Sequence, residues 1–429
     1  MRLAFTPATL LLAVATVAIA SCDSGSNGSQ PNQAPIAAYT MSPADGLVPL
    51  VVSFDASGSA DADGRIDSFD WQFGDGAVGR GMVVQHSYDD PGDFAVRLTV
   101  TDDDGTSATA EKTVNVRPIT AVAHFSVSVL PALSGSRFEP KDINDSGQVI
   151  GNSFFSDSGS LLATIHENGV TSELPRLDAG ESYVRDINNA GQAVGTLSFP
   201  EGLGVAFLYE DGVTTDLRDV LGTMTGAEGI NEAGLIVGTY ERPDLALRSY
   251  IYNDGIVQDV GTLGGWMTVA VAINNADQVI GSGSTADGQF HAFVLSEGVL
   301  QDIGTLGGDN SYAHAVNDHG VIVGIATTIA GGANYRGFIY ANGVMEEIGS
   351  EGDWHSDPAD INNLGQIVGS IADHGFIWDE TNGLRDLNDL VDPDLGFTIK
   401  VVTGINDRGQ IVGYDYNDEG TAFLLTPER

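Results

Sequence analysis

Aromatic, histidine and aspartate side chains cluster in three segments of the second half of the chain. They are Trp266, Tyr312, His314, Asp353, Trp354 and His355. Aromatic rings can stack on sugar rings, and neighbouring aspartate and histidine side chains can bond sugar hydroxyl groups. The alternative is that these side chains fill gaps between structural units. We predict a ligand-binding site on these residues and assign no catalytic residue.

An extracellular hydrolase or lyase acting on polysaccharide is the alternative function. Its acid and base groups would have to come from Asp353, His355 and His314. The sequence contains neither Gly-x-Ser-x-Gly nor His-Glu-x-x-His, and no clustered metal-ligand spacing. We therefore expect a binding protein rather than an enzyme.

An acidic segment between residues 59 and 70 is the one candidate for a metal. Its carboxylates Asp61, Asp63, Asp67 and Asp70 fall close to the ligand spacing of a twelve-residue calcium loop. Ser59 at the first position departs from that loop, and helices do not flank the segment. The two interpretations are a calcium site and a solvated acidic turn. Calcium is the only cofactor that the sequence suggests.

Residues 1–21 have the pattern of a signal peptide, with one arginine near the start and an apolar stretch from Leu10 to Ile19. The segment ends in Ile19-Ala20-Ser21-Cys22, which resembles a lipoprotein signal, and Cys22 is the only cysteine. We expect a lipid on Cys22 to anchor the protein. Residues 22–33 are rich in Ser, Gly, Asn and Gln, and we expect them to form a flexible tether.

A segment of the type Asp142-Ile-Asn-Asp-Ser-Gly-Gln-Val-Ile-Gly151 occurs seven times in the remaining chain. Its asparagine recurs every 43 to 45 residues, at Asn144, Asn188, Asn231, Asn274, Asn317, Asn362 and Asn406. Short apolar runs and tight turns fill each repeat, and none has the apolar periodicity of a helix. A period in the forties built from strands and turns is typical of propeller blades.

The number of strands predicts how the ring closes. Six copies carry four strands, whereas the seventh ends after the strand at 421–425. Residues 124–131 precede the first copy and have the sequence of a strand. We predict that they pair beside 421–425 to complete a seventh blade, which leaves no long unpaired edge. Binding sites are expected on the face that carries the variable loops.

The repeats resemble the HAF repeat of extracellular bacterial proteins. The His-Ala-Phe triplet occurs at His291-Ala292-Phe293, with altered copies such as His374-Gly375-Phe376, and Gly-Thr-Leu-Gly-Gly occurs at 261–265 and 304–308. The resemblance covers about 124–429. It implies an extracellular location and no particular chemistry.

Residues 34–117 resemble a PKD domain. The motifs are Val52-Ser-Phe-Asp-Ala-Ser-Gly-Ser59, Trp71-Gln-Phe-Gly-Asp-Gly76 and the strand that follows Pro91. The side chains from Phe94 to Val100 alternate between apolar and polar, as in a half-buried strand of a β-sandwich. We expect Trp71 and Phe73 to lie in its core. The predicted fold class is all-β, with the PKD sandwich followed by a seven-bladed propeller over 118–429.

The charge of the chain limits its partners. It has 59 acidic and 18 basic residues, a formal net charge of −41. Nucleic acid and anionic lipid would be repelled by such a surface, so contact with a membrane should depend on the lipid anchor alone. We expect a monomer in the cell envelope that binds an extracellular polysaccharide or a surface protein.

Overall fold

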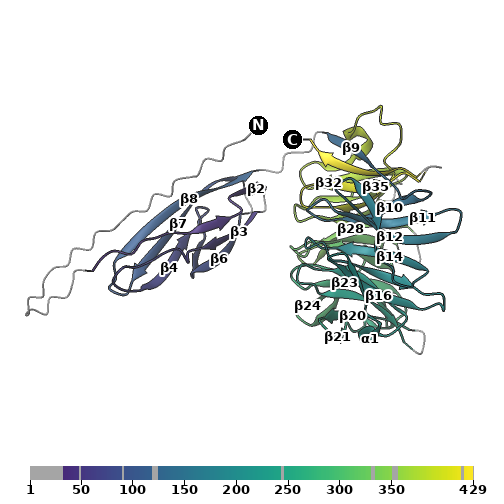
Figure 1. Cartoon of the computed structure of the whole chain (residues 1–429), viewed down its shortest axis with the longest axis horizontal. Coiled ribbons are helices and arrows are strands. Elements are labelled where there is room, and N and C mark those ends of the chain that lie inside the picture. Colours follow the sequence, from purple (N-terminus) through teal and green to yellow (C-terminus); the bar gives the residue numbers. More distant parts are fainter. Residues whose placement is uncertain are drawn as a thin grey trace, which may run out of the picture. The chain divides into compact units, whose positions relative to one another are not determined.

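The computed structural model describes residues 32–47, 50–88, 91–117, 124–242, 246–329, 334–349, 356–416 and 420–428. Among them the only helices are α1 (Arg218–Leu221) and the 3-10 helix η1 (Leu387–Leu390), and strands form nearly all other regular structure (Figure 1). No helix in these ranges is both long and apolar enough to cross a membrane. The chain divides after Arg117 into two compact units.

The first unit is a β-sandwich of two sheets, with strand orders β1-β3-β6 and β2-β8-β7-β4-β5. Its strands are β1 (Thr40–Ser42), β2 (Asp45–Leu47), β3 (Leu50–Asp55), β4 (Ile66–Gln72), β5 (Val78–Arg80), β6 (Val83–Tyr88), β7 (Gly92–Asp102) and β8 (Ser107–Arg117). Alternate side chains of β7, Val96 and Leu98 among them, are buried between the sheets. Trp71 and Phe73 are buried as well, and the Trp71 ring centroid lies 5.5 Å from that of Phe54. The prediction that Trp71 and Phe73 belong to the core is confirmed.

The second unit is a propeller of seven four-stranded antiparallel sheets, so the predicted fold class is confirmed. The first, innermost strands are β10 (Arg137–Ile143), β14 (Glu181–Ile187), β18 (Thr225–Ile230), β22 (Gly264–Ile273), β26 (Ser311–Val316), β30 (Ser356–Ile361) and β34 (Val401–Ile405). The second strands are β11 (Val149–Phe155), β15 (Ala193–Ser198), β19 (Ile236–Glu241), β23 (Val279–Thr285), β27 (Ile322–Thr327), β31 (Ile367–Ile371) and β35 (Ile411–Tyr414). The third strands are β12 (Ser160–Glu167), β16 (Gly204–Glu210), β20 (Leu247–Asn253), β24 (Phe290–Ser296), β28 (Tyr335–Ala341), β32 (His374–Asp379) and β36 (Ala422–Pro427). The outer strands are β13 (Val170–Glu173), β17 (Val213–Asp216), β21 (Ile256–Asp259), β25 (Val299–Asp302), β29 (Val344–Glu347), β33 (Gly383–Asp386) and β9 (Phe125–Leu130).

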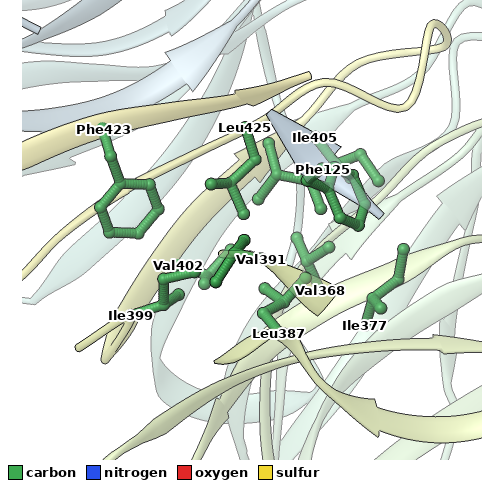
Figure 2. Packing of buried hydrophobic residues seen from close by; sticks show 11 residues of the cluster. Phe125, Val368, Ile377, Leu387, Val391, Ile399, Val402, Ile405, Phe423 and Leu425 are labelled. Atoms are coloured by element: carbon green, nitrogen blue, oxygen red, sulfur yellow. The ribbon is translucent and has the colours of Figure 1, made fainter. Parts of the chain in front are cut away.

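The N-terminal strand β9 closes the ring as the sequence predicts. It pairs antiparallel with β36, from Ala422 opposite Leu130 to Pro427 opposite Phe125. Phe125 is fully buried among residues of the last two blades, including Val391 and Leu425 (Figure 2). This apolar cluster joins the beginning of the propeller to its end, so both ends of the ring are held by buried side chains as well as by backbone hydrogen bonds.

The closing glycine of each repeat is required by a close approach of two strands. A Cβ atom on Gly281 would lie 2.0 Å from the Val269 carbonyl oxygen of the first strand and 2.8 Å from the Phe293 ring. The equivalent contact with a first-strand carbonyl oxygen is 1.9 to 2.4 Å at the other six positions, Gly151, Gly195, Gly238, Gly324, Gly369 and Gly413. The phenylalanine of the His-Ala-Phe triplet therefore packs directly on this glycine. A larger residue in place of the glycine would push the phenylalanine ring and the first strand away.

The repeated asparagines link the seven blades in a closed ring of hydrogen bonds. The Asn144 side-chain amide donates to the Asn188 carbonyl oxygen of the next blade, at 3.0 Å. The same bond recurs at Asn188, Asn231, Asn274, Asn317 and Asn362, and Asn406 completes the ring by donating to the Asn144 carbonyl oxygen at 2.9 Å. All seven side chains are buried, with 3 to 5% of their surface exposed. These asparagines are the positions that must repeat because each one holds the next blade.

Candidate functional site

A central channel runs between the innermost strands and has a volume of about 290 Å³. Each innermost strand has a β-bulge three residues before its ring asparagine, and the bulged side chain lines the channel. The seven bulged residues are Lys141, Arg185, Glu228, Val271, His314, Ala359 and Thr403. The ring asparagines repeat, whereas these seven side chains are all different. The fold therefore presents a variable set of groups from a constant backbone position.

Two of the few basic residues of the chain stand at consecutive bulges. The Arg185 Nε atom lies 3.4 Å from the Glu228 carboxylate, which belongs to the following blade. Burial raises the pKa of Glu228, and Arg185 opposes that rise. Lys141 has no hydrogen bond or ion pair to any residue that the structure describes. Burial lowers the pKa of Lys141, Glu139 acts in the opposite direction, and the positive charge of Arg185 adds to the lowering.

Three aspartates, each one residue after a bulge, lie partly buried beside the channel. Asp142 accepts a hydrogen bond from the Ile187 backbone amide, Asp186 from Ile230 and Asp360 from Ile405, each across a blade boundary. Burial is the largest cause that raises the pKa of Asp186 well above its ordinary value and that of Asp360 to about 7, and the Asp142 charge adds to both shifts. These carboxylates hold neighbouring blades together, in agreement with a structural role for the repeated Asp-Ile-Asn.

An alternating rim of acids and amides surrounds the channel at the end that carries the Asn-x-x-Gly turns, which we name the turn face. Each rim side chain accepts a hydrogen bond from the backbone amide of the preceding blade; the residues are Asp145, Asn189, Glu232, Asn275, Asp318, Asn363 and Asp407. Seven positions cannot alternate two kinds of residue around a closed ring. Two acids therefore meet where the last blade joins the first, with the Asp407 amide donating to the Asp145 carboxylate at 3.0 Å.

Four aromatic rings form a row across blades four and five at the opposite end of the propeller, which we name the loop face. Trp266 makes an edge contact with Phe290 at 6.4 Å between centroids, Phe290 stacks on Tyr312 at 6.1 Å, and Tyr312 meets Tyr335 at 5.9 Å. All four stand within the first three residues of their strands, at the ends where the variable loops join. Trp266 is 56% exposed. Burial is the largest cause that raises the pKa of Tyr312, and Tyr335 adds to the rise.

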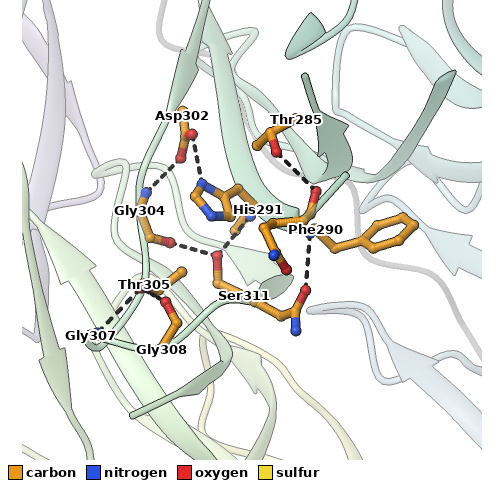
Figure 3. Close-up of polar contacts among 12 residues, drawn as sticks. Thr285, Phe290, His291, Asp302, Gly304, Thr305, Gly307, Gly308 and Ser311 are labelled. Atoms are coloured by element: carbon orange, nitrogen blue, oxygen red, sulfur yellow. Dashed lines mark hydrogen bonds and ion pairs between the residues drawn. The ribbon is translucent and has the colours of Figure 1, made fainter. Parts of the chain in front are cut away.

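The two Gly-Thr-Leu-Gly-Gly segments build matching supports for this row. In the connection from blade four to blade five, Gly304 donates its backbone amide to Asp302, and the Ser311 hydroxyl donates to the Gly304 carbonyl oxygen at 2.5 Å (Figure 3). In the connection from blade three to blade four, Gly261 donates to Asp259 and the Thr268 hydroxyl donates to the Gly261 carbonyl oxygen. With the two segments aligned, Trp266 occupies the position of Asp309. The repeated Gly-Thr-Leu-Gly-Gly segment therefore forms the same hydrogen-bonded support in both places. The exposed indole is present only where Trp266 replaces the aspartate at the next position.

The His-Ala-Phe histidines lie outside the aromatic row. His291 Nδ1 lies 2.7 Å from the Asp302 carboxylate on the neighbouring outer strand (Figure 3), and His374 pairs in the same way with Asp386. In another blade Arg336 and Glu347 occupy the same two strands. A paired basic and acidic residue across the third and fourth strands is therefore part of the blade.

The structure brings together only some of the predicted ligand-binding residues. Trp266 and Tyr312 belong to one row, although they stand on β22 and β26 rather than in the connecting loops. His314 lies in the channel, where its Nδ1 donates to the Pro358 carbonyl oxygen at 2.7 Å. Asp353, Trp354 and His355 lie outside the described residues, as does Cys22. Sequence reasoning missed Phe290 and Tyr335. Their position at the start of a third strand, on the same face of the propeller as Trp266 and Tyr312, could have identified them as members of the row.

The acidic segment of the first unit holds its carboxylates by different contacts. Asp63 accepts the Gln33 backbone amide, Asp70 pairs with Arg80, and Asp67 lies 3.7 Å from Arg65. Both Asp61 carboxylate oxygens are buried without a hydrogen bond to the described residues. Those residues contain no group of three or more His, Cys, Asp or Glu arranged to hold a metal ion. Calcium binding at Asp61, Asp63, Asp67 and Asp70 stays a prediction.

Residues 32–117 match the family model of the PKD domain. The first unit is a PKD domain. It is 40% identical over 75 residues to collagenase ColQ1 of Bacillus cereus, which is 18% of this chain and 8% of that enzyme. The PKD1 domain of Vibrio anguillarum Epp is 36% identical and covers 20% of this chain and 99% of its own, with a TM-score of 0.19. The likeness to ColQ1 is thus confined to a small part of that collagenase.

The propeller has a more distant structural neighbour. The β-propeller domain of the Trilobed protease from Pyrococcus furiosus is 10% identical and covers 70% of this chain and 95% of its own, with a TM-score of 0.47. The substrates of collagenase ColQ1 and of the Trilobed protease are properties of those two enzymes.

Proposed function

We propose that this chain is an exported, lipid-anchored binding protein whose propeller holds an extracellular polysaccharide on the aromatic row of the loop face. The exposed Trp266 ring in line with Phe290, Tyr312 and Tyr335 carries the proposal. Stacked rings suit the flat faces of sugars, and side chains held at strand starts need little ordering when a ligand binds. The PKD domain would act as a spacer or as a second contact module.

The charge of the chain points to the class of polysaccharide. At a formal net charge of −41, a polyanion such as alginate would be repelled over the whole surface, whereas a neutral chain would not. Stacking on aromatic rings requires no charge on the sugar. The proposed ligand is therefore a neutral polysaccharide with accessible pyranose faces.

Affinity electrophoresis of the soluble 34–429 fragment in gels containing xylan, mannan or alginate tests this proposal. We expect retardation by at least one neutral polysaccharide and none by alginate. Trp266→Ala should weaken the retardation by roughly fivefold or more, because an aromatic anchor contributes at least about 1 kcal/mol. Tyr416→Ala is the matched control, since Tyr416 is 50% exposed but belongs to another blade. Equal binding by a folded Trp266→Ala variant would show that the row is not the site.

Membrane attachment is proposed to depend on Cys22 alone. The described residues include no membrane-spanning helix, and the acidic surface would not attract anionic lipid. Cys22→Ala should therefore move the full-length protein out of the membrane fraction or block its maturation. Mass spectrometry of the mature wild-type protein provides the decisive measurement, and an unmodified Cys22 thiol would rule the anchor out.

A further inference from the structure

The channel contains a cationic corner that the binding row does not use. Lys141 and Arg185 project from the same bulge position of consecutive blades, and both line the cavity of about 290 Å³. A chain with 18 basic residues among 429 thus places two of them side by side in one cavity. The Lys141 ammonium group has no hydrogen bond or ion pair to any described residue.

An unpaired ammonium group at such a position costs stability, so a counter-ion is expected to fill the site. Moving a charge away from water is unfavourable unless an opposite charge or a set of acceptors replaces the water. Two carboxylates that could serve as the counter-ion already have partners, because Glu139 accepts a hydrogen bond from Arg137 and Glu228 lies beside Arg185. Arg185 keeps further donors after that contact, since a guanidinium group has five N–H groups.

We propose that the channel binds a small carboxylate, held between the Lys141 ammonium group and the Arg185 guanidinium group. A guanidinium fork and an ammonium point charge together are suited to the two oxygens of one carboxylate. The cavity is at the lower end of the range of about 300–1,000 Å³ for small-molecule sites, so the ligand is no larger than a monosaccharide.

The surrounding groups define the rest of the ligand. Glu228 and His314 stand at the same level of the channel, and the Asp145, Glu232, Asp318 and Asp407 carboxylates occupy the turn-face rim. These groups accept hydrogen bonds from hydroxyl or ammonium groups, and the carboxylates among them repel a second anion. The ligand is therefore a monocarboxylate that also carries donors, and a sugar acid and a free amino acid both have this chemistry.

Isothermal titration calorimetry of the 34–429 fragment with sodium glucuronate, L-alanine and glucose, at matched ionic strength, tests the proposal. We expect heat of binding from glucuronate or L-alanine, which identifies the source of the carboxylate, and none from glucose. Lys141→Met should weaken binding roughly ten- to hundredfold, as loss of a charge-assisted contact predicts, while Lys141→Arg should restore much of it. Arg176→Met is the control, because Arg176 pairs with Glu173 outside the channel.

Thermal unfolding of the same variants shows whether Lys141 acts on the ligand or on the fold. Without ligand, Lys141→Met should melt at the wild-type temperature or above, since it removes a poorly solvated charge. Added carboxylate should then raise the unfolding temperature of the wild type and leave that of Lys141→Met unchanged. Absence of any carboxylate binding by the wild type would overturn the proposal, and so would equal binding by Lys141→Met or by glucose. The aromatic row could still bind polysaccharide in each of these cases.

Discussion

Replacing one ring asparagine should destabilise the whole propeller. The Asn274 side-chain amide donates to the Asn317 carbonyl oxygen of the next blade and to the Gln278 side chain, both at 2.8 Å. Its Oδ1 accepts the backbone amides of Ala276 at 3.1 Å and Gln278 at 2.9 Å. Asn274→Ala therefore removes four hydrogen bonds from a buried position. At about 1 kcal/mol each, the free energy of unfolding should fall by roughly 4 kcal/mol.

Differential scanning calorimetry of the 34–429 fragment measures this loss. A shift of about 2 °C per kcal/mol for a domain of this size gives an unfolding temperature about 8 °C lower. Asn253→Ala is the control, because Asn253 is exposed and its side chain makes no hydrogen bond to the described residues. We expect less than about 0.5 kcal/mol from this surface substitution. Similar shifts for the two variants would refute the view that the ring holds the blades together.

Three further predictions follow from other contacts. Gly281→Ala should lower the unfolding temperature by several degrees, because its Cβ would lie 2.0 Å from the Val269 carbonyl oxygen, and an unchanged temperature would contradict the close packing. Asp360 has a folded-state pKa of about 7 against an ordinary 3.8. The stability that the protonated Asp360 carboxyl contributes to the folded state is therefore fully present below pH 3.8 and is lost as pH rises through about 7. Asp360→Asn should therefore flatten the fall in unfolding temperature between pH 4 and 7, and an identical slope in wild type and variant would count against this origin. Calcium should raise the unfolding temperature of the PKD domain and a chelator should reverse the rise, whereas Asp61→Asn should show neither effect; a wild type that does not respond to calcium would leave a solvated turn.

The number of blades can be predicted from the sequence because every blade needs the same few residues. Asn274 bonds to the next blade and Gly281 allows two strands to approach, so neither position tolerates much change. The spacing of these two residues was therefore enough to predict seven blades, and the count of strands in the seven copies predicted the pairing of β9 with β36. The role of Trp71 in the PKD core was predictable for a similar reason, since alternation along a strand assigns side chains to one face or the other.

The candidate sites depended on contacts that spacing cannot show. Lys141 and Arg185 are 44 residues apart in the sequence, and only the ring of blades places their bulges side by side. A bulge also changes which way a side chain points, so His314 lies in the channel although Tyr312 two residues earlier belongs to the aromatic row. Repetition determines the frame because every blade must fit its neighbours. The residues that vary on this frame acquire a common site only when the ring closes, and this is why tertiary structure alone decided which of them meet.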